Sequence, residues 1–454
     1  MEFSQLFFLY VLLPVTLLGY FLIPDVGRKN VWLLVVSLVF CGLCSPVSVP
    51  VYLVLTVVNF QLGKEVTPGK RVTMLAALAV NLAVLAALRV LNIRIPGIAF
   101  YTLSVCGYFA DVYRKKIRPE ESLLRFMLYL LMFPRLFQGP IVSNDSMRKA
   151  LGQRRQNWRR VFEGVLRFSL GLGKKVLLAD YCGRMIAELA EGSSGALIGA
   201  WLTAVLYMFR IYFDFSGYTD MAIGLGGIFG FRFPENFKLP YEACSIQEFC
   251  GRWHMSLGNY LKEYVYEPLC GKGKSDYWHY ACMAITAVLG GLWHGFELNY
   301  LAWGLYFFVL IMAERLLGQY IFDLPMVIRR TLTMLAVLLG WVIFSNEGTT
   351  AMAAALKAMT GFGGAVTEGD GMRVLNCLPL LAACCLFASR WPGKLVMWWK
   401  GFCGVAGKLQ KDNRVTALRI AYVASGVGFV VLMLWLCTVS RMGNSVQPSI
   451  FAML

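Results

Sequence analysis

The chain has 454 residues, of which 58% are hydrophobic and 15% are charged, and its mean hydropathy is +0.60. Ordinary soluble domains are roughly 45–50% apolar and about 25% charged, so the composition excludes a soluble protein and predicts one integral membrane domain over residues 1–454. The net charge of +17 does not indicate a nucleic-acid partner, because the basic residues form short clusters between apolar runs, as in cytoplasmic loops that face anionic lipid headgroups.

Apolar runs recur along the whole chain and predict an all-α, polytopic protein with about eleven transmembrane helices. The first run has no basic segment before it, so we expect it to stay as a helix of a multi-pass inner-membrane protein rather than to be cleaved. Residues 97–113 and 217–231 are too short or too rich in glycine to be counted as crossings. The expected crossings are 3–23, 31–44, 49–61, 72–92, 161–190, 195–213, 281–296, 298–318, 329–345, 374–389 and 415–440.

Segment 122–142 is apolar but has a basic cluster on each side, which the positive-inside rule would place on one face of the membrane. Pro134, Gly139 and Pro140 interrupt its second half. Irregular backbone at membrane depth is tolerated where protein or a water-filled cavity surrounds it. We therefore expect a re-entrant hairpin that lines a cavity.

Arg210, Asp214 and Asp220 are charged residues within the apolar part of the stretch 210–242. Arg210 and Asp214 are one helical turn apart, so we expect a structural ion pair between them, while Asp220 marks either a second pair or a polar pathway. The glycines near residue 226 miss the GxGxxG spacing and follow no predicted strand, which excludes a dinucleotide site.

Segment 245–266 begins with Ser245 and Glu248 at capping-box spacing. The apolar residues that follow recur with helical period and predict one amphipathic helix that is interfacial or re-entrant. His254 lies at the edge of the apolar stripe, where a polar cavity would meet packed protein.

His294 lies inside an apolar run, between Trp293 and Gly295, and the chain has only three histidines. Gly291 and Gly295 form a small-xxx-small pair that lets neighbouring helices approach closely. A histidine at that depth faces either the packed bundle or a polar pathway, and the residues alone leave the two roles equally open.

No nucleophile elbow or HExxH motif occurs, and three histidines do not build a rich metal centre, so we predict no metal site. Two intramembrane histidines are also compatible with axial ligation of a haem. Segments 361–373 and 390–414 are expected to be loops, the second lying on the membrane interface because of its tryptophans and basic residues.

Three longer motifs carry a resemblance: FDFSGYTDMAIGLGGIFGFRFPENFKLPY, RWHMSLGNYLKEYVYEPL and GGLWHG. They resemble the bacterial, alginate O-acetylase-like branch of the membrane-bound O-acyltransferase family. The motif-bearing core would cover about 97–320, followed by C-terminal helices over about 329–440. The resemblance implies many helices around a central tunnel, with His294 catalytic and His254 supporting it. The tunnel or supporting residues would be Trp293, Trp253, Tyr260, Tyr264, Ser256, Asn259 and Asp220.

The resemblance also implies a reaction. An acetyl group would pass from a cytoplasmic thioester, with acetyl-CoA as cosubstrate and no tightly bound cofactor, towards hydroxyls of an exported polysaccharide. A partner transferase outside the cytoplasm would complete the delivery. A neutral imidazole suits this work as a general base on the acceptor hydroxyl, and a dry tunnel would limit hydrolysis of the acyl group.

Two departures from the family pattern keep alternatives open. The stretch EPLCGKGKSDYW replaces a more glycine-rich PLGG sequence, and the end QPSIFAML lacks the aromatic ending of alginate-type relatives. The alternatives are D-alanyl transfer to teichoic acid from a carrier-protein thioester, a transporter or flippase that uses the same cavity, and the haem protein.

Overall fold

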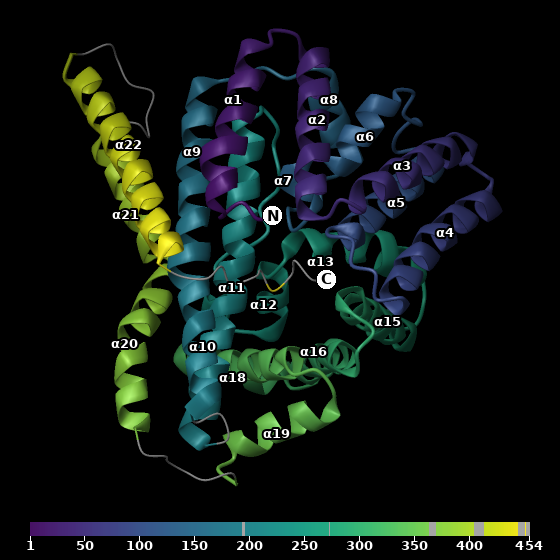
Figure 1. The fold of residues 1–454 in the computed structure, drawn as a ribbon. Helices are drawn as coiled ribbons and strands as arrows, with labels where there is room; N and C mark the ends of the chain where they lie inside the picture. Colours follow the sequence, from purple (N-terminus) through teal and green to yellow (C-terminus); the bar gives the residue numbers. More distant parts are fainter. Residues whose placement is uncertain (193–195, 272, 363–368, 404–412, 444–449, 451–454) are drawn as a thin grey trace.

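The computed structural model describes residues 1–192, 196–271, 273–362, 369–403, 413–443 and 450, and every regular element in these ranges is helical (Figure 1). The N-terminal third contains short and long helices that form the upper part of the molecule in Figure 1. These elements are η1 (Phe8–Leu12), α1 (Leu13–Leu22), α2 (Val26–Cys44), α3 (Ser48–Glu65), α4 (Arg71–Val90), α5 (Ile98–Tyr113), α6 (Leu123–Leu131), α7 (Phe133–Leu136) and α8 (Asn144–Gly152).

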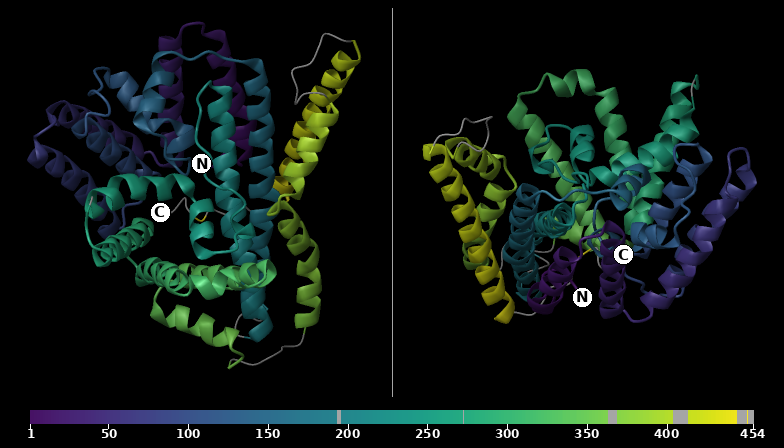
Figure 2. Two further views of the ribbon diagram at one scale, coloured as in Figure 1. Left: turned by 180° about the vertical axis from the view of Figure 1, so that it is seen from behind. Right: turned by 90° about the horizontal axis from the view of Figure 1, so that it is seen from above.

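The central third forms the spine of the fold and the short helices beside it. Helices α9 and α11 run antiparallel through the middle of the molecule and pack along their lengths (Figures 1 and 2). The elements are α9 (Trp158–Gly173), η2 (Lys174–Ala179), α10 (Asp180–Gly192), α11 (Leu197–Ile228), η3 (Pro240–Glu242), α12 (Ile246–Arg252), α13 (Met255–Leu261), η4 (Lys262–Tyr266), α14 (Glu267–Cys270) and α15 (Asp276–His294).

The C-terminal third covers two sides of this spine. Helices α16 and α18 cross its lower part, whereas α20, α21 and α22 form an outer layer beside α9 and α10 (Figure 1). The elements are α16 (Leu298–Leu316), α17 (Gly318–Phe322), α18 (Met326–Ser345), α19 (Thr349–Met359), α20 (Asp370–Phe387), α21 (Trp391–Phe402) and α22 (Asn413–Met442).

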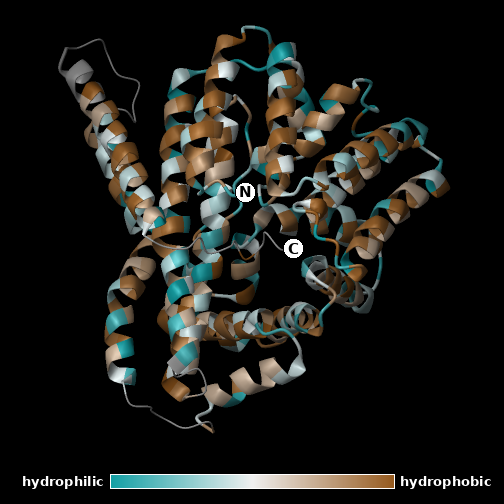
Figure 3. Cartoon of the chain, viewed as in Figure 1, coloured by the Kyte–Doolittle hydropathy of each residue, from teal (hydrophilic) through white to brown (hydrophobic). Residues whose placement is uncertain are grey.

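Six described helices are long and apolar enough to cross a membrane: α2, α4, α11, α18, α20 and residues 420–442 of α22. Large apolar side chains such as Leu22, Val54 and Val72 are exposed on the outer helices, and hydrophobic residues recur along these helices (Figure 3). A surface of this kind is stable in lipid but not in water. The structure is therefore that of a multi-pass membrane protein.

The glycine-rich stretch 217–231, which we did not count as a crossing, lies largely inside α11. A Cβ atom on Gly217 would lie 2.8 Å from the carbonyl oxygen of Gly171, and one on Gly224 would lie 2.5 Å from that of Gly164. These glycines let α9 and α11 touch backbone to backbone, as small residues do between membrane helices. Tertiary packing therefore supports a helix that glycine content argued against.

Segment 122–142 is broken as expected. Helix α6 ends at Leu131, and Pro134 lies in the first turn of the four-residue α7. Tyr129, Ile141 and Val142 line a cavity of about 390 Å³. The prediction that this segment lines a cavity is confirmed.

The expected continuous helix over 245–266 is wrong. Ser245 caps α12 as predicted, accepting a hydrogen bond from the Glu248 amide at 3.0 Å. However, α12 ends at Arg252, and His254 adopts a left-handed backbone with φ of +42° before α13 begins. The loop expected over 390–414 is also partly wrong, because 391–402 form α21; the part of that segment after residue 403 and before 413 lies outside the described residues.

Candidate active site

Two of the three histidines line one cavity. His254, at the junction of α12 and α13, and His294, the last residue of α15, both border a largely apolar cavity of about 290 Å³. Both side chains are almost fully buried. Residues that are 40 positions apart in the sequence therefore line the same buried cavity.

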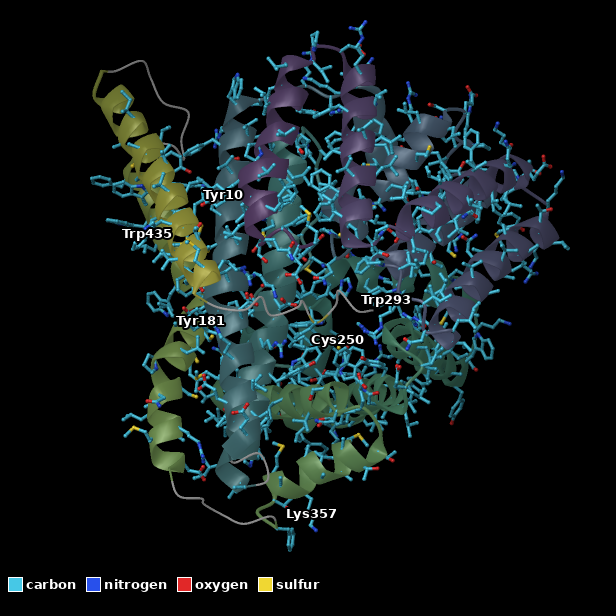
Figure 4. All side chains as sticks on the ribbon, in the orientation of Figure 1. Tyr10, Tyr181, Cys250, Trp293, Lys357 and Trp435 are labelled. Atoms are coloured by element: carbon cyan, nitrogen blue, oxygen red, sulfur yellow. The ribbon has the colours of Figure 1, made fainter. Side chains whose placement is uncertain are left out.

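The Trp293 indole connects the two imidazoles. Its ring centroid lies 5.8 Å from that of His254 and 4.8 Å from that of His294, with steep interplanar angles of 62° and 75°. Trp293 also packs edge-on against Phe100, and Figure 4 places it near the centre of the molecule. The indole therefore fixes the relative positions of the two histidines.

The backbone and one asparagine determine where His254 points. A left-handed backbone is unfavourable for a residue with a Cβ atom, so the surrounding structure must hold it. Asn236 Oδ1 lies 3.1 Å from His254 Nδ1, and the Phe215 ring packs edge-on against the imidazole at 4.7 Å. The break between α12 and α13 thus directs the imidazole into the cavity wall.

His294 lies in an aromatic cage at the end of α15. The rings of Trp303 and Phe344 lie 5.5 and 5.1 Å from the imidazole. The Arg89 guanidinium of α4 donates hydrogen bonds to the carbonyl oxygens of Leu292, at 2.8 Å, and Trp293. A cation at a helix C-terminus satisfies carbonyls that lack intrahelical partners, so Arg89 anchors the end of the helix that carries His294.

The predicted close approach beside His294 is present. A Cβ atom on Gly291 would lie 2.3 Å from the carbonyl oxygen of Tyr300, and one on Gly304 would lie 2.4 Å from that of Ala287. Helices α15 and α16 therefore pack backbone to backbone. Gly295 lies beyond the helix end, where a Cβ atom would clash with the Tyr300 ring.

The other predicted tunnel residues are divided between cavities. Trp253 lines the histidine cavity and packs on Trp341, with centroids 4.7 Å apart. The second cavity, of about 390 Å³, is more polar and is lined by four of the predicted residues. These are Ser256, Asn259, Tyr260 and Tyr264.

Asp220 is not in the histidine cavity. It borders a third cavity of about 1140 Å³ between the spine and α20–α22. Its carboxylate accepts hydrogen bonds from Lys174 at 2.6 Å and from Arg167 at 2.8 and 3.0 Å. Asp220 is therefore ion-paired with two cations of the neighbouring α9 and η2.

The expected Arg210–Asp214 pair is corrected. The Asp214 carboxylate lies 2.7 Å from Nζ of Lys175 on η2, and the same ammonium lies 2.9 Å from Asp180. The Arg210 guanidinium lies beside Gly183 of α10. Sequence spacing identified a turn neighbour, but the fold brings a lysine from another element onto the acid.

Two contributors to the site escaped the sequence analysis. In the sequence, Arg89 is one more basic residue near the end of an apolar run, and Asn236 lies in a polar stretch after an apolar one. Both act through long-range contacts, so a periodic pattern carries no signal for them. Asn236 is fully buried, and its only signal in the sequence is that it is the single amide residue of the motif FRFPENFKLP.

The similarity of this chain to known proteins includes the region that carries both histidines. The sequence model of the membrane-bound O-acyltransferase family matches residues 100–353, which include both histidines. The probable alginate O-acetylase AlgI of Pseudomonas syringae pv. tomato is 33% identical over 398 residues, covering 80% of this chain and 76% of that protein. The peptidoglycan O-acetyltransferase of Helicobacter pylori is 29% identical over 423 residues, covering 80% of each chain. The teichoic acid D-alanyltransferase of Bacillus subtilis is 27% identical over 229 residues, covering 47% of this chain and 57% of that protein.

Proposed function

The chain belongs to the membrane-bound O-acyltransferase family and is an O-acyltransferase, and on this premise we propose that it moves acetyl groups onto hydroxyls of a cell-surface polysaccharide. The observation that carries this proposal is the cavity that His254 and His294 line together. The acetyl assignment rests on similarity to two O-acetyltransferases over 80% of the chain, whereas similarity to a D-alanyltransferase covers less than half.

The chemistry needs a neutral imidazole and an activated acyl donor. His294 takes the proton of the acceptor hydroxyl while the oxygen of that hydroxyl attacks the carbonyl carbon of the thioester. The tetrahedral intermediate then collapses, the carbon–sulfur bond breaks, and the leaving thiolate takes the proton from the imidazolium. The products are an ester and a free thiol. The apolar lining of the cavity keeps bulk water from competing with the acceptor.

The donor would come from the cytoplasm as a thioester, with acetyl-CoA as the cosubstrate. The polar cavity of about 390 Å³ is suited to its entry, since Ser146 and Arg232 line it and the basic segment 148–160 follows in the chain. Basic connections between membrane helices face the cytoplasm, and this orients the protein in the inner membrane. In this proposal about eleven helices cross the membrane around a tunnel. A transferase outside the cytoplasm would receive the acetyl group.

The test compares ester-linked groups on surface polymers, by mass spectrometry, between cells that produce the wild type and cells that produce His294→Ala. We expect acetyl esters in the first and none in the second. His279→Ala is the matched control, because this third histidine contacts Cys270 and Tyr266 and does not line the histidine cavity.

Four outcomes would overturn parts of the proposal. Unchanged ester content in His294→Ala cells would exclude catalysis by His294. A D-alanyl mass in place of acetyl would support the D-alanyl alternative. A protein that leaves every polymer unmodified, or one that shows a Soret band when purified, would support transport or haem binding.

A further inference from the structure

Asn236 is the residue that links His254 to the loop between α11 and α12. It is fully buried, and its backbone oxygen accepts a hydrogen bond from the Met255 amide at 2.9 Å. Its side-chain Oδ1 lies 3.0 Å from the Ser256 backbone nitrogen and 3.1 Å from His254 Nδ1. One asparagine therefore contacts three consecutive residues at the break between α12 and α13.

The Ser256 contact determines which way the Asn236 amide faces. A backbone N–H donates hydrogen bonds and does not accept them, so the atom 3.0 Å from the Ser256 nitrogen must be the amide oxygen. The same oxygen faces His254 Nδ1 and can only accept a hydrogen bond from it. His254 Nδ1 therefore carries the ring hydrogen.

This arrangement fixes the chemical character of the other ring nitrogen. A neutral imidazole has one donor nitrogen and one acceptor nitrogen, so Nε2 holds the lone pair. His254 Nε2 is buried and has no hydrogen-bond partner among the described residues, and His254 lines the histidine cavity. The ring edge turned away from Asn236 thus presents an acceptor.

The contact between Asn236 and His254 is kept although two features of it are energetically unfavourable, which indicates a functional role. Asn236 Nδ2 is buried without a hydrogen-bond partner among the described residues, which is unfavourable for an amide donor. His254 additionally holds a left-handed backbone. An asparagine with only a packing role would gain by satisfying its Nδ2, whereas here the structure satisfies Oδ1.

We propose that Asn236 is a positioning residue that holds neutral His254 in the tautomer with its hydrogen on Nδ1, so that Nε2 accepts a hydrogen bond from a hydroxyl in the cavity. The hydroxyl is the reacting group of the acceptor or its neighbour, and this assignment rests on the proposed function. Neutral His254 consequently orients the acceptor and does not donate a hydrogen bond from Nε2 to the developing oxyanion.

The chain offers a direct measurement of the tautomer, because it has only three histidines. Protein labelled with ¹⁵N-histidine, studied by nuclear magnetic resonance at about pH 8 where an ordinary histidine is neutral, gives separate signals for protonated and bare ring nitrogens. A His254→Gln sample assigns the His254 signals. We expect a protonated Nδ1 and a bare Nε2, and the opposite pattern would overturn the proposal.

Two variants extend the test. Asn236→Leu has a similar volume but no acceptor, so we expect a mixture of tautomers and a fall in kcat of up to about 10²-fold, the loss that misplacement of a substrate-positioning group causes. Asn236→Asp keeps an acceptor and should preserve the Nδ1–H tautomer. If Asn236→Leu keeps both the tautomer and kcat, the proposal is wrong; if it does not fold, the wild-type spectrum decides.

Different results would contradict the proposed function and the role of Asn236. If the wild type transfers no acetyl group, the proposed function is wrong, and the tautomer spectrum still tests the role of Asn236. A bare Nδ1 on His254 in an active acetyltransferase would remove the role of Asn236 alone.

Discussion

The indole of Trp293 lies against both His254 and His294, with ring centroids 5.8 and 4.8 Å away. His294 is its neighbour in the sequence, whereas His254 reaches it from the junction of two short helices. This contact makes the separation of the two imidazoles depend on one rigid side chain.

Replacing Trp293 with Leu should therefore disturb catalysis through geometry. The smaller leucine side chain leaves a cavity beside both imidazoles. Replacing a buried aromatic side chain with alanine lowers the free energy of unfolding by about 3–5 kcal/mol, so replacement with leucine should lower it by less. We expect acyl transfer to fall at least about tenfold, since even a small misplacement of reacting groups is costly. Steady-state kinetics with purified protein measures it, and Trp293→Phe, which keeps an aromatic ring, should retain more activity. Equal activity in the leucine variant would show that the ring does not position the histidines.

Arg89 should affect the site although it does not line the histidine cavity. Arg89→Gln removes the guanidinium that holds the carbonyl oxygens of Leu292 and Trp293, so the last turn of α15 should fray and His294 should lose its position. We expect a lower kcat with little change in membrane insertion. Arg71→Gln, an exposed change at the start of the same helix, is the control and should behave like the wild type.

Gly291→Ala tests the close packing of α15 on α16. The new Cβ atom would lie 2.3 Å from the carbonyl oxygen of Tyr300, so the helices must separate. Overpacking of this kind costs about 1–3 kcal/mol, which thermal unfolding in detergent would register as a lower Tm. Gly251→Ala in α12, where a Cβ atom meets nothing within 4 Å, should not lower the Tm.

Lys175 should matter more to stability than Arg210. Lys175→Met leaves the buried carboxylates of Asp214 and Asp180 without their shared ammonium, and breaking a buried ion pair costs about 3–5 kcal/mol. Arg210→Met removes the cation that lies beside Gly183 and should cost less. A comparison of urea unfolding midpoints measures the difference. A larger fall in the midpoint for Arg210→Met than for Lys175→Met would support the Arg210–Asp214 pair that the sequence spacing predicted.

The Glu242–Arg390 ion pair predicts a pH dependence. Burial raises the pKa of Glu242, but hydrogen bonds from the Arg390 guanidinium and backbone outweigh it and hold this pKa below its usual range. A carboxyl with a lowered folded-state pKa adds stability above its unfolded pKa of about 4.3, and this is lost as the pH falls through the folded value. Glu242→Gln should therefore lower the Tm at neutral pH. The Tm of this variant should also decrease less than that of the wild type as the pH falls. Glu121→Gln, an exposed change, should leave the curve unchanged.

The sequence determined the class of the protein and the identity of its two central residues. Composition and apolar runs required a membrane-embedded helical bundle, because long uncharged stretches are stable only in lipid or protein. Ser245 was recognised as a helix cap and Gly291 as a close-packing position, since both effects act over a few residues. The motifs around His254 and His294 indicated an acyltransferase, and the family comparisons agree.

Only the tertiary structure decided how these residues meet. The helix break at His254, the oxygen of Asn236 on its ring and the guanidinium of Arg89 under His294 all depend on contacts between segments far apart in the chain. The same holds for Asp214, whose partner is Lys175 from η2 rather than the turn neighbour Arg210. A one-dimensional pattern records helical period and local caps, whereas the partner of a buried polar group is set by which helices pack together.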